Sequence, residues 1–540
     1  MIVPPRPPDQ KTIDEYVAKG YWGDTTFADV LERRAAESPD REVYADARRR
    51  ITYANLWSEV LRCAEFLRRQ GVRRGDVVTI QLPNRIEFPV VFFSLELVGA
   101  IANKVSPDFR ATEVEYIMRF SRSSAYVGAA RFKGFEYLPM IREIRPRLPD
   151  LKLVICVDPV DEPGVTSLGT VLTTALPTAA RDRVRMSAYE VMRMCFTSGT
   201  TGNPKGVLHS FNTTLSTCAR FNGELAMTDR DVLLIYLPVG LNWGYFTLVQ
   251  TVLAGARAVL MERFSAEAAL DTIERERVTY IPTAPASIVA MLNSPTLARR
   301  DLASLRVVVT GGASAALETI KAFQAAVPKA KLLEMYGMLE TGVHIHTWLT
   351  DDPVKVNATV GRCVPHMGLR IIDDAGKDVP YGEDGEIAAK GPSVHIGYLD
   401  NEAANRDSFT PDGWFRTGDL ARYADADGNV RIVGRKKEII NRGGKKYFPR
   451  EVEELLYGHP KIMQVAIVGV PDPRVGEKNC LCVIPKEGAS LALDEVVSFL
   501  RGRVADYKLP EQLIVMDEFP MTPTGKLKRS DLVKRVVGGE

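Results

Sequence analysis

One stretch gathers hydroxyl groups, glycines and a lysine where they could bind phosphate. Residues 197–207 read Thr-Ser-Gly-Thr-Thr-Gly-Asn-Pro-Lys-Gly-Val, directly after an apolar run over 191–196 that predicts a buried strand. Glycine lets the backbone approach a ligand, and backbone N–H groups, hydroxyls and a lysine all bind phosphate oxygens. The spacing differs from the common phosphate loop, because Lys205 follows Gly202 by three residues and Pro204 intervenes. The stretch predicts a phosphate-binding loop, and a mobile Ser/Gly surface loop is the alternative.

Four further motifs follow this loop along the chain. They read Tyr-Gly-Met-Leu-Glu-Thr, Trp-Phe-Arg-Thr-Gly-Asp, Gly-Arg-Lys-Lys-Glu-Ile-Ile-Asn-Arg-Gly-Gly and Pro-Thr-Gly-Lys, at 336–341, 414–419, 434–444 and 523–526. In this order, the motifs and the loop resemble the adenylate-forming superfamily of acyl-CoA synthetases, luciferases and stand-alone adenylation enzymes. The similarity runs from about residue 25 to 532. It implies that ATP activates a carboxylic acid as acyl-AMP, with release of pyrophosphate, before a thiol takes the acyl group.

The activation step needs cations and oriented donors, because its transition state is strongly anionic. By the resemblance, the loop over 197–205 cradles the β- and γ-phosphates. Glu340 ligates Mg²⁺, a hard cation that prefers carboxylate and phosphate oxygens, although a solvated acid at a helix start is the alternative. Lys526 reaches the carboxylate and α-phosphate during adenylation and leaves before the thiol attacks. The predicted catalytic residues are Lys526, Glu340 and Lys205.

The nucleoside half of ATP also has candidate contacts. A carboxylate can accept from two vicinal hydroxyls at once, as ribose requires, and the resemblance gives this role to Asp419. Tyr336 offers a face to adenine, unless it is a core tyrosine. Arg435 contacts the ribose and α-phosphate, unless it is a surface cation. The ATP site implied by the resemblance comprises Thr197, Ser198, Gly199, Thr200, Thr201, Gly202, Lys205, Gly312, Ala313, Tyr336, Gly337, Thr341, Asp419, Arg435 and Lys526.

The acid pocket departs from its relatives at one loop. In 2,3-dihydroxybenzoate–AMP ligases the comparable run reads His-Asn-aromatic, and here it reads Leu241-Asn242-Trp243. Asn242 can bond a hydroxyl, amine or carbonyl of the acid, while Trp243 either walls the pocket or packs in the core. His344 and His346 would share one face of a strand; no Cys or carboxylate ligand set is near, so we expect pocket lining rather than metal binding. The predicted acid-binding residues are Leu241, Asn242, Trp243, Gly312, Gly337, Met338 and His344.

The thiol acceptor also has candidate contacts. Gly443, Gly444 and Lys445 belong to a glycine-rich cationic segment that lines the pantetheine tunnel in the CoA ligases of this superfamily, after the C-terminal domain rotates. Arg263 is a candidate for a CoA phosphate, although lone arginines are usually solvated. The positive charge over 435–446 attracts CoA and an acidic carrier protein alike.

A second departure lies in the motif at 336–341. Most relatives carry a threonine that bonds the α-phosphate where this chain has Leu339. A hydrogen bond to a charged group contributes roughly 1.5–3 kcal/mol, so some binding energy is lost unless Thr341 or backbone N–H groups compensate.

Strand and helix patterns alternate over the first ~430 residues, which predicts an α/β domain of mostly parallel sheets flanked by helices. The apolar run over 88–105 reads as one core helix. The resemblance adds a small β-barrel subdomain and a mobile α+β C-terminal lid. We therefore expect an N-terminal adenylation domain over 1–434, a lid over 435–540 and a hinge near Lys437.

Composition excludes several classes of protein. A net charge of +2 gives no attraction to nucleic acid or an anionic membrane, and the chain has 45% apolar residues, typical of a globular enzyme. The N-terminus is proline-rich and has no apolar signal core. Seven scattered cysteines indicate a reducing compartment without a disulfide framework, so we expect a cytoplasmic enzyme.

The sequence favours an AMP-forming carboxylic acid–CoA ligase that uses ATP, Mg²⁺ and CoA. The acid is expected to be aryl, alicyclic or medium-chain. The alternatives are a stand-alone enzyme that loads an aryl acid onto a carrier protein's phosphopantetheine arm, a luciferase-like oxygenase, and a nucleotide-binding module that has lost catalysis. The sequence leaves a homodimer open and predicts neither nucleic-acid binding nor membrane insertion.

Overall fold

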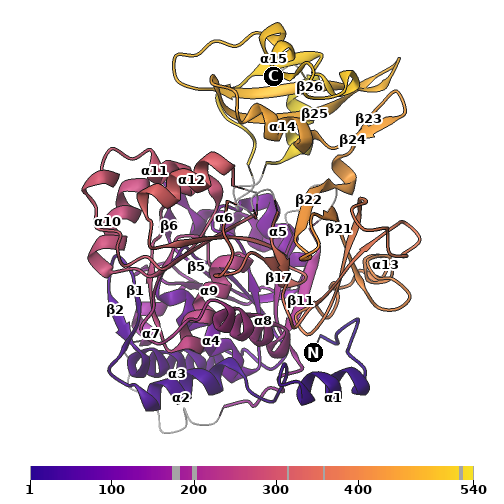
Figure 1. Ribbon diagram of the computed structural model, residues 1–540. Helices are drawn as coiled ribbons and strands as arrows, with labels where there is room; N and C mark the ends of the chain where they lie inside the picture. Colours follow the sequence, from indigo (N-terminus) through magenta and orange to yellow (C-terminus); the bar gives the residue numbers. More distant parts are fainter. Residues whose placement is uncertain are drawn as a thin grey trace.

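The computed structural model describes residues 2–172, 183–197, 204–312, 315–354, 356, 359–521 and 527–538. Figure 1 shows a large body that carries most of the chain and a smaller C-terminal layer, in yellow, above it. Among the described residues no helix has both the length and the apolarity to cross a bilayer.

A nine-stranded mixed sheet forms one half of the large body. Its central strands are parallel, and β2, β17 and β18 pair antiparallel at its two edges. Its strands, in sheet order, are β18 (Arg362–Cys363), β17 (Gly342–His346), β16 (Lys331–Met338), β15 (Val307–Gly311), β14 (Tyr280–Thr283), β12 (Val232–Ile235), β13 (Arg257–Leu260), β1 (Glu42–Ala45) and β2 (Arg50–Thr52).

A seven-stranded sheet forms the other half, and it is parallel except for the edge strand β11. Its order is β11 (Gly206–Ser210), β10 (Val191–Phe196), β4 (Ile101–Lys104), β3 (Val77–Gln81), β5 (Ser123–Gly128), β8 (Leu153–Cys156) and β9 (Thr166–Ser167). The predicted α/β class with mostly parallel sheets is therefore confirmed.

The largest apolar core joins these two sheets, and alternating strand residues separate it from the outer cores. Leu233 and Val307 face this shared core, whereas Leu234 and Val308 face an outer layer of helices. The shared core contains side chains of α2 (Phe27–Glu37), α3 (Tyr53–Arg69), α4 (Glu87–Val98), α8 (Phe211–Glu224) and α9 (Asn242–Ala254). The outer layers contain α5 (Ala111–Phe120) and α6 (Tyr137–Ile144) on one sheet and α10 (Ala266–Glu276), α11 (Pro285–Leu292) and α12 (Leu317–Ala326) on the other.

The apolar run over 88–105 is not one helix. It divides into α4 and β4, because Gly99 adopts φ 77° and ends the helix in the left-handed conformation that glycine accepts. All residues of α4 after Glu87 are buried, which explains a helix that is apolar all round.

Two further sheets complete the fold. The third is an antiparallel path of β19 (Gly368–Ile372), β20 (Gly385–Lys390), β21 (Phe415–Tyr423) and β22 (Val430–Arg435), in the region where the resemblance implied a small barrel. Short backbone pairings extend it at both ends, from residues 360–361 to β22 and from residues 378–379 to β19. The fourth belongs to the C-terminal layer and contains β24 (Lys445–Tyr447), β23 (Ile440–Arg442), β26 (Gly476–Pro485), β25 (Ile462–Asp472) and β27 (Gln512–Val515), with α14 (Pro449–Leu456), α15 (Leu493–Leu500) and α16 (Arg529–Gly538). The short 3-10 helix η4 (Lys436–Glu438) connects these two sheets.

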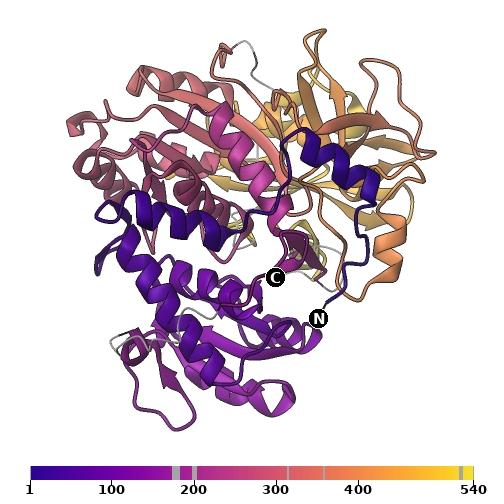
Figure 2. The same ribbon diagram turned by 90° about the horizontal axis from the view of Figure 1, so that it is seen from below.

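The N-terminal segment and its helix α1 (Gln10–Ala18) pack against the residues around 392–405. The Arg6 backbone N–H donates to the Ile396 carbonyl at 3.1 Å, and the Trp22 indole N–H donates to the Pro392 carbonyl at 3.0 Å. Figure 2 shows this segment, in indigo, running beside the orange part of the chain. The first residues therefore help to hold the third sheet on the main body.

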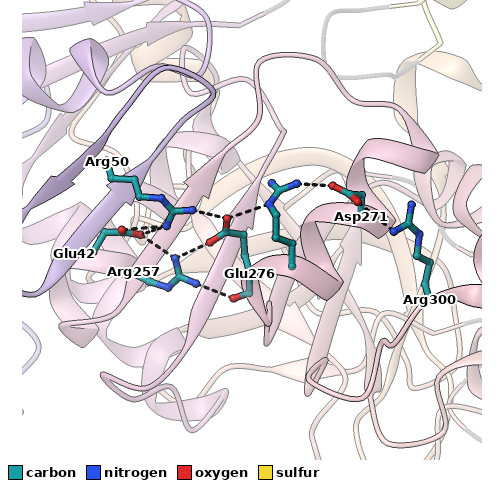
Figure 3. A network of polar contacts seen from close by, with 7 residues as sticks. Glu42, Arg50, Arg257, Asp271, Glu276 and Arg300 are labelled. Carbon is teal, nitrogen blue, oxygen red and sulfur yellow. Dashed lines mark hydrogen bonds and ion pairs between the residues drawn. The ribbon is translucent and has the colours of Figure 1, made fainter.

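An ion-pair network ties the edge of the nine-stranded sheet to α10 (Figure 3). Glu276 lies at its centre, where Arg50 and Arg257 contact the two carboxylate oxygens at 2.5 and 3.0 Å. Burial alone would raise the pKa of Glu276, but hydrogen bonds from three arginines outweigh it and lower the pKa to about 2. The network therefore favours the charged carboxylate in the folded state.

Candidate functional site

A cleft of about 2810 Å³ brings the predicted motifs together between the main body and the C-terminal layer. It opens beyond the carboxyl ends of the central strands of the nine-stranded sheet, where ligands of open α/β sheets bind. Motifs separated by more than 200 residues meet in it. Its lining includes Thr197, Lys205, Gly312, Tyr336, Gly337, Met338, Glu340, Asp419, Arg435 and Lys437 from the predicted set.

Asp419 lies at the centre of one polar group in this cleft. The hydroxyl of Tyr336 donates to Asp419 Oδ2 at 2.8 Å, and Arg435 Nε lies 3.0 Å from Oδ1. The pairing of β21 with β22 sets Asp419 opposite Arg435, and β16 supplies Tyr336. A nearly buried carboxylate held from two sides keeps further lone pairs for the hydroxyls of a ligand.

Glu340 lies at the centre of a second polar group. It is 6% exposed, in the turn between β16 and β17, so it is not the solvated helix-start acid that the sequence left open. The hydroxyl of Tyr398 donates to Glu340 Oε1 at 3.2 Å, and Lys205 Nζ lies 4.8 Å from the centre of the Tyr398 ring. Burial raises the pKa of Glu340, while the Tyr398 hydrogen bond and the charges of Lys205 and Arg435 oppose that rise. The site thus places a buried carboxylate close to a cation.

Sequence reasoning missed Tyr398. It has no motif spacing of its own. Backbone pairing of residues 396–399 with 206–208, including the bridge between Tyr398 and Val207, brings it beside Lys205. The backbone N–H of His395 also donates to the Glu340 carbonyl at 2.7 Å. The segment around 395–398 therefore holds Glu340 through both its backbone and its side chain.

The donor set around Glu340 fits Mg²⁺ better than a transition metal. The described residues contain no group of three or more His, Cys, Asp or Glu side chains that could hold a metal ion. A single carboxylate is sufficient for Mg²⁺ when the remaining ligands are phosphate oxygens and water. The residues present thus fit a cation that is shared with a phosphate ligand.

The predicted phosphate loop is described only at its two ends. Thr197 and Lys205 close it: the Thr197 N–H donates to the Lys205 carbonyl at 3.0 Å, and the Lys205 N–H donates to Thr197 Oγ1 at 3.2 Å. These bonds continue the antiparallel pairing of β10 with β11. The predicted residues that lie outside the described part are Ser198, Gly199, Thr200, Thr201, Gly202, Ala313 and Lys526.

Close backbone packing explains the glycine in the Tyr-Gly motif. A Cβ atom at Gly337 would lie 2.3 Å from the carbonyl oxygen of Gly342, so only glycine fits. Thr341 is fully buried, is not among the lining residues of the cleft, and donates its hydroxyl to Gly342 at 3.2 Å. Leu339 lines the cleft, and its carbonyl oxygen lies 2.8 Å from His209 Nε2. Most relatives carry a threonine that bonds the α-phosphate at the position of Leu339. The Thr341 hydroxyl is not oriented to take over that bond.

An apolar part of the same cleft contains the predicted acid-binding loop. Leu241, Asn242 and Trp243 line it at the start of α9, and Asn242 Oδ1 is buried without a hydrogen-bond partner among the described residues. A Cβ atom at Gly311 would lie 3.1 Å from the Trp243 ring, so the indole packs on the end of β15. Asn242 therefore offers an acceptor to a ligand in an otherwise apolar wall.

The two histidines of β17 lie in the core. His344 is fully buried, its Nε2 lies 3.0 Å from the Gly368 carbonyl, and it is not among the lining residues of the cleft. Burial lowers the pKa of His344 to about 4, so it is neutral at pH 7. His346 instead contacts Glu224 Oε2 at 2.8 Å. The histidines thus have separate partners.

The predicted CoA contacts are not among the lining residues of this cleft. Gly443 and Gly444 form the two-residue turn between β23 and β24, with φ 60° and 79°, the positive values that such hairpin turns require. Lys445 Nζ lies 5.2 Å from the centre of the Tyr507 ring. Arg263 is exposed, and its guanidinium lies 5.6 Å from the centre of the Phe132 ring.

Comparison with known proteins agrees with this geometry. The AMP-binding enzyme family matches residues 31–399, and the AMP-binding enzyme C-terminal domain matches 451–526. The medium-chain fatty-acid–CoA ligase of Escherichia coli is 32% identical over 96% of this chain and 93% of its own, and the 2,3-dihydroxybenzoate-AMP ligase of Bacillus subtilis is 32% identical over 96% and 95%.

Solved structures of the CoA ligase AuaEII and of MatB are also similar to this chain over most of its length. The anthranilate CoA ligase AuaEII in complex with anthranoyl-AMP superposes with a TM-score of 0.87 and 25% identity, covering 96% of this chain and 98% of its own. ATP-bound MatB from Rhodopseudomonas palustris superposes with a TM-score of 0.85 and 26% identity, covering 94% and 99%.

Proposed function

Because the chain belongs to the AMP-binding enzymes of the adenylate-forming superfamily, we propose that it is an AMP-forming carboxylic acid–CoA ligase. In the first step the acid carboxylate attacks the α-phosphorus of ATP, and pyrophosphate leaves. In the second step the thiol of CoA attacks the acyl-AMP, and AMP leaves. The observation that carries this proposal is the single cleft in which Asp419, Glu340 and the apolar loop 241–243 meet.

Each polar group of the cleft suits one part of ATP. Asp419 accepts from the two ribose hydroxyls while Tyr336 and Arg435 hold its carboxylate in place. Lys205 and Thr197 lie at the ends of the phosphate loop, where they donate to phosphate oxygens. These fixed donors stabilise the negative charge that develops as pyrophosphate departs.

Glu340 is the residue that would hold Mg²⁺. The bound ion supplies positive charge to the phosphate oxygens. Tyr398 orients the Glu340 carboxylate through its hydroxyl, and burial excludes competing water from it. Lys205, across the Tyr398 ring, adds the second positive charge on this side of the cleft.

The second step requires the C-terminal layer to change position. In our proposal residues 435–540 form the lid, Lys437 in η4 is its hinge, and Lys526 acts in adenylation. Gly443, Gly444 and Lys445 on the lid, with Arg263 on the main body, then receive CoA. Their places away from the cleft support a hinge motion between the two steps.

The first test is AMP release with free CoA over a panel of benzoates, cyclohexanecarboxylate and straight-chain acids of six to twelve carbons. We expect turnover with the acids of one of these classes, aryl, alicyclic or medium-chain. Lys526→Ala should abolish pyrophosphate exchange while thioester formation from supplied acyl-AMP largely survives. Exchange near the wild-type rate in this variant would show that Lys526 lacks the proposed role.

A second candidate is the loading of an aryl acid onto a carrier protein. Two relatives favour it, and both are as similar to this chain as the medium-chain fatty-acid–CoA ligase is, at 32% identity. They are the 2,3-dihydroxybenzoate-AMP ligase and the pyochelin synthase PchD of Pseudomonas aeruginosa, which matches over 97% of this chain. Pyrophosphate exchange with an aryl acid, without AMP release on addition of CoA, would select this candidate.

A further inference from the structure

Two buried basic side chains face the shared core with no counter-ion among the described residues. Lys104 is 1% exposed and Arg193 is fully buried. Lys104 Nζ and both terminal nitrogens of Arg193 lack hydrogen-bond partners among the described residues. Only Arg193 Nε is satisfied, by Thr214 Oγ1 at 3.2 Å. Burying a charge without a partner costs several kcal/mol per ion. Burial accordingly lowers the pKa of Lys104 to about 7 and lowers the pKa of Arg193, so a partner that stabilises the charged forms is missing from the described residues.

The register of three neighbouring strands places these cations together. Lys104 ends β4 and lies opposite Cys195 of β10, while Arg193 of β10 lies opposite His209 of β11. Residues that alternate along a strand share a face, so Arg193 and Cys195 point the same way. The Tyr245 ring of α9 covers both cations, with its centre 4.2 Å from Lys104 Nζ and 4.9 Å from the Arg193 guanidinium.

This cationic pair lies directly behind one wall of the cleft. Cys195 lines the cleft beside Lys104, and its thiol donates to the Gly240 carbonyl at 3.9 Å. Phe246 also lines the cleft, with its ring centre 5.7 Å from the Arg193 guanidinium. Phe246 follows Asn242 by about one turn of α9, and Gly240 precedes Asn242 by two residues, so both wall residues lie near the loop where the proposed function places the acid.

The neighbouring groups supply no negative charge. His209 is neutral, because burial and the charge of Arg193 lower its pKa, and its two ring nitrogens are used by Thr213 and the Leu339 carbonyl. The other described neighbours that act on these two groups are the Thr214 hydroxyl, the thiols of Cys195 and Cys218 and the Tyr245 side chain. A buried water could satisfy some of these donors, but it carries no charge to balance the guanidinium of Arg193.

We propose that Lys104 and Arg193 receive an oxygen-bearing group at the far end of the acid substrate, either a second carboxylate or a ketone carbonyl. This inference rests on the proposed function and narrows its substrate class from apolar acids to acids that are polar at both ends. The guanidinium offers two parallel donors and the ammonium a third, which matches a carboxylate. The Cys195 and Phe246 side chains must turn aside for the ligand to enter.

Matched acids test the proposal. AMP release is measured with diacids of four to ten carbons, with oxo acids that carry a ketone at the far end, and with plain monoacids of equal length. We expect kcat/KM to be roughly tenfold or more higher for one oxygen-bearing class than for the monoacid. Lys104→Met and Arg193→Met should lower that kcat/KM roughly 10- to 100-fold and leave the monoacid within about threefold.

Thermal unfolding separates binding from a structural role. Removing an unpaired buried charge should leave Tm unchanged or raise it in both variants. Arg85→Met is the matched control, because Arg85 is 4% exposed but pairs with Asp158 and Glu262 at 2.9 and 2.5 Å, so its loss should lower Tm. The preferred acid should raise the Tm of the wild type and not that of Lys104→Met.

Two results would overturn the inference. One is a wild type that prefers the monoacids, with the same preference in both variants. The other is a fall in Tm in Lys104→Met and Arg193→Met as large as in Arg85→Met, which would make the cations structural. If no acid gives AMP release, the proposed function fails. The rise in Tm on addition of the acid, compared between the wild type and Lys104→Met, still decides whether the site binds an oxygen-bearing acid.

Discussion

Replacing Tyr398 with phenylalanine removes one hydroxyl group and keeps the ring. That hydroxyl donates to Glu340 Oε1 at 3.2 Å, while the ring carries the contact with Lys205 at 4.8 Å. A hydrogen bond to a charged group contributes about 1.5–3 kcal/mol, and 3.2 Å is long for such a bond. We therefore take about 1.5 kcal/mol, which corresponds to roughly a tenfold loss in kcat/KM for pyrophosphate exchange.

The pH dependence of Tyr398→Phe gives an independent check. Burial already raises the pKa of Glu340, and the Tyr398 hydrogen bond opposes that rise by stabilising the carboxylate. Loss of the bond must raise the pKa further, so the acidic limb of the pH–rate profile should move to higher pH. Tyr398→Leu should lose more activity than Tyr398→Phe, because it also removes the ring from Lys205.

The assay is ATP–pyrophosphate exchange between pH 5.5 and 9 with an acid that supports turnover. Tyr423→Phe is the matched control, since Tyr423 lies on the third sheet, stacks on Tyr381 at 5.7 Å and is not among the lining residues of the cleft. The reasoning is refuted if Tyr398→Phe is folded and exchanges pyrophosphate at the wild-type rate, with its acidic limb at an unchanged pH.

Three further predictions concern the site and the fold. Asp419→Asn should raise KM for ATP at least tenfold in steady-state assays, because the amide weakens the contacts with Arg435 and with the ribose; an unchanged KM would remove Asp419 from the nucleotide site. Gly337→Ala should abolish exchange and lower Tm, because the added Cβ meets the Gly342 carbonyl at 2.3 Å, and wild-type behaviour would contradict that geometry. Glu276→Gln should cost about 1–2 kcal/mol in urea unfolding at pH 7, a value reduced for solvent screening of the exposed arginines. Because the folded-state pKa is depressed to about 2, this difference should be complete above about pH 5 and shrink as the pH falls towards 2; a constant difference would exclude the charge as its cause.

Local patterns identified most of the elements that position the site. Within the alternating strand and helix patterns of the first ~430 residues, the runs over 77–80 and 305–309 predict short strands, and β3 and β15 confirm them with shifts of one or two residues. The prediction of one helix over 88–105 was wrong, because an apolar segment that is buried on all sides has no periodicity to distinguish a helix from a strand. Gly99 was the available signal for the division.

The site was predictable to the extent that its residues belong to motifs. Asp419, Glu340 and Tyr336 carry recognisable neighbours, so their convergence in one cleft could be expected. Tyr398 could not be found, because its partner Lys205 is distant in sequence and the two meet only when the segments 396–399 and 206–208 pair in the folded chain.

The sequence by itself determined the superfamily, the order of the motifs and the chemistry they serve, because these depend on residue types at short spacings. The tertiary structure decided which residues share a face and which lose contact with water. His344 turned into the core, and Lys104 and Arg193 came together from strands about 90 residues apart in sequence. The energy of a buried charge depends on its partners in space, so the unpaired cations became visible only when the sheet register was known.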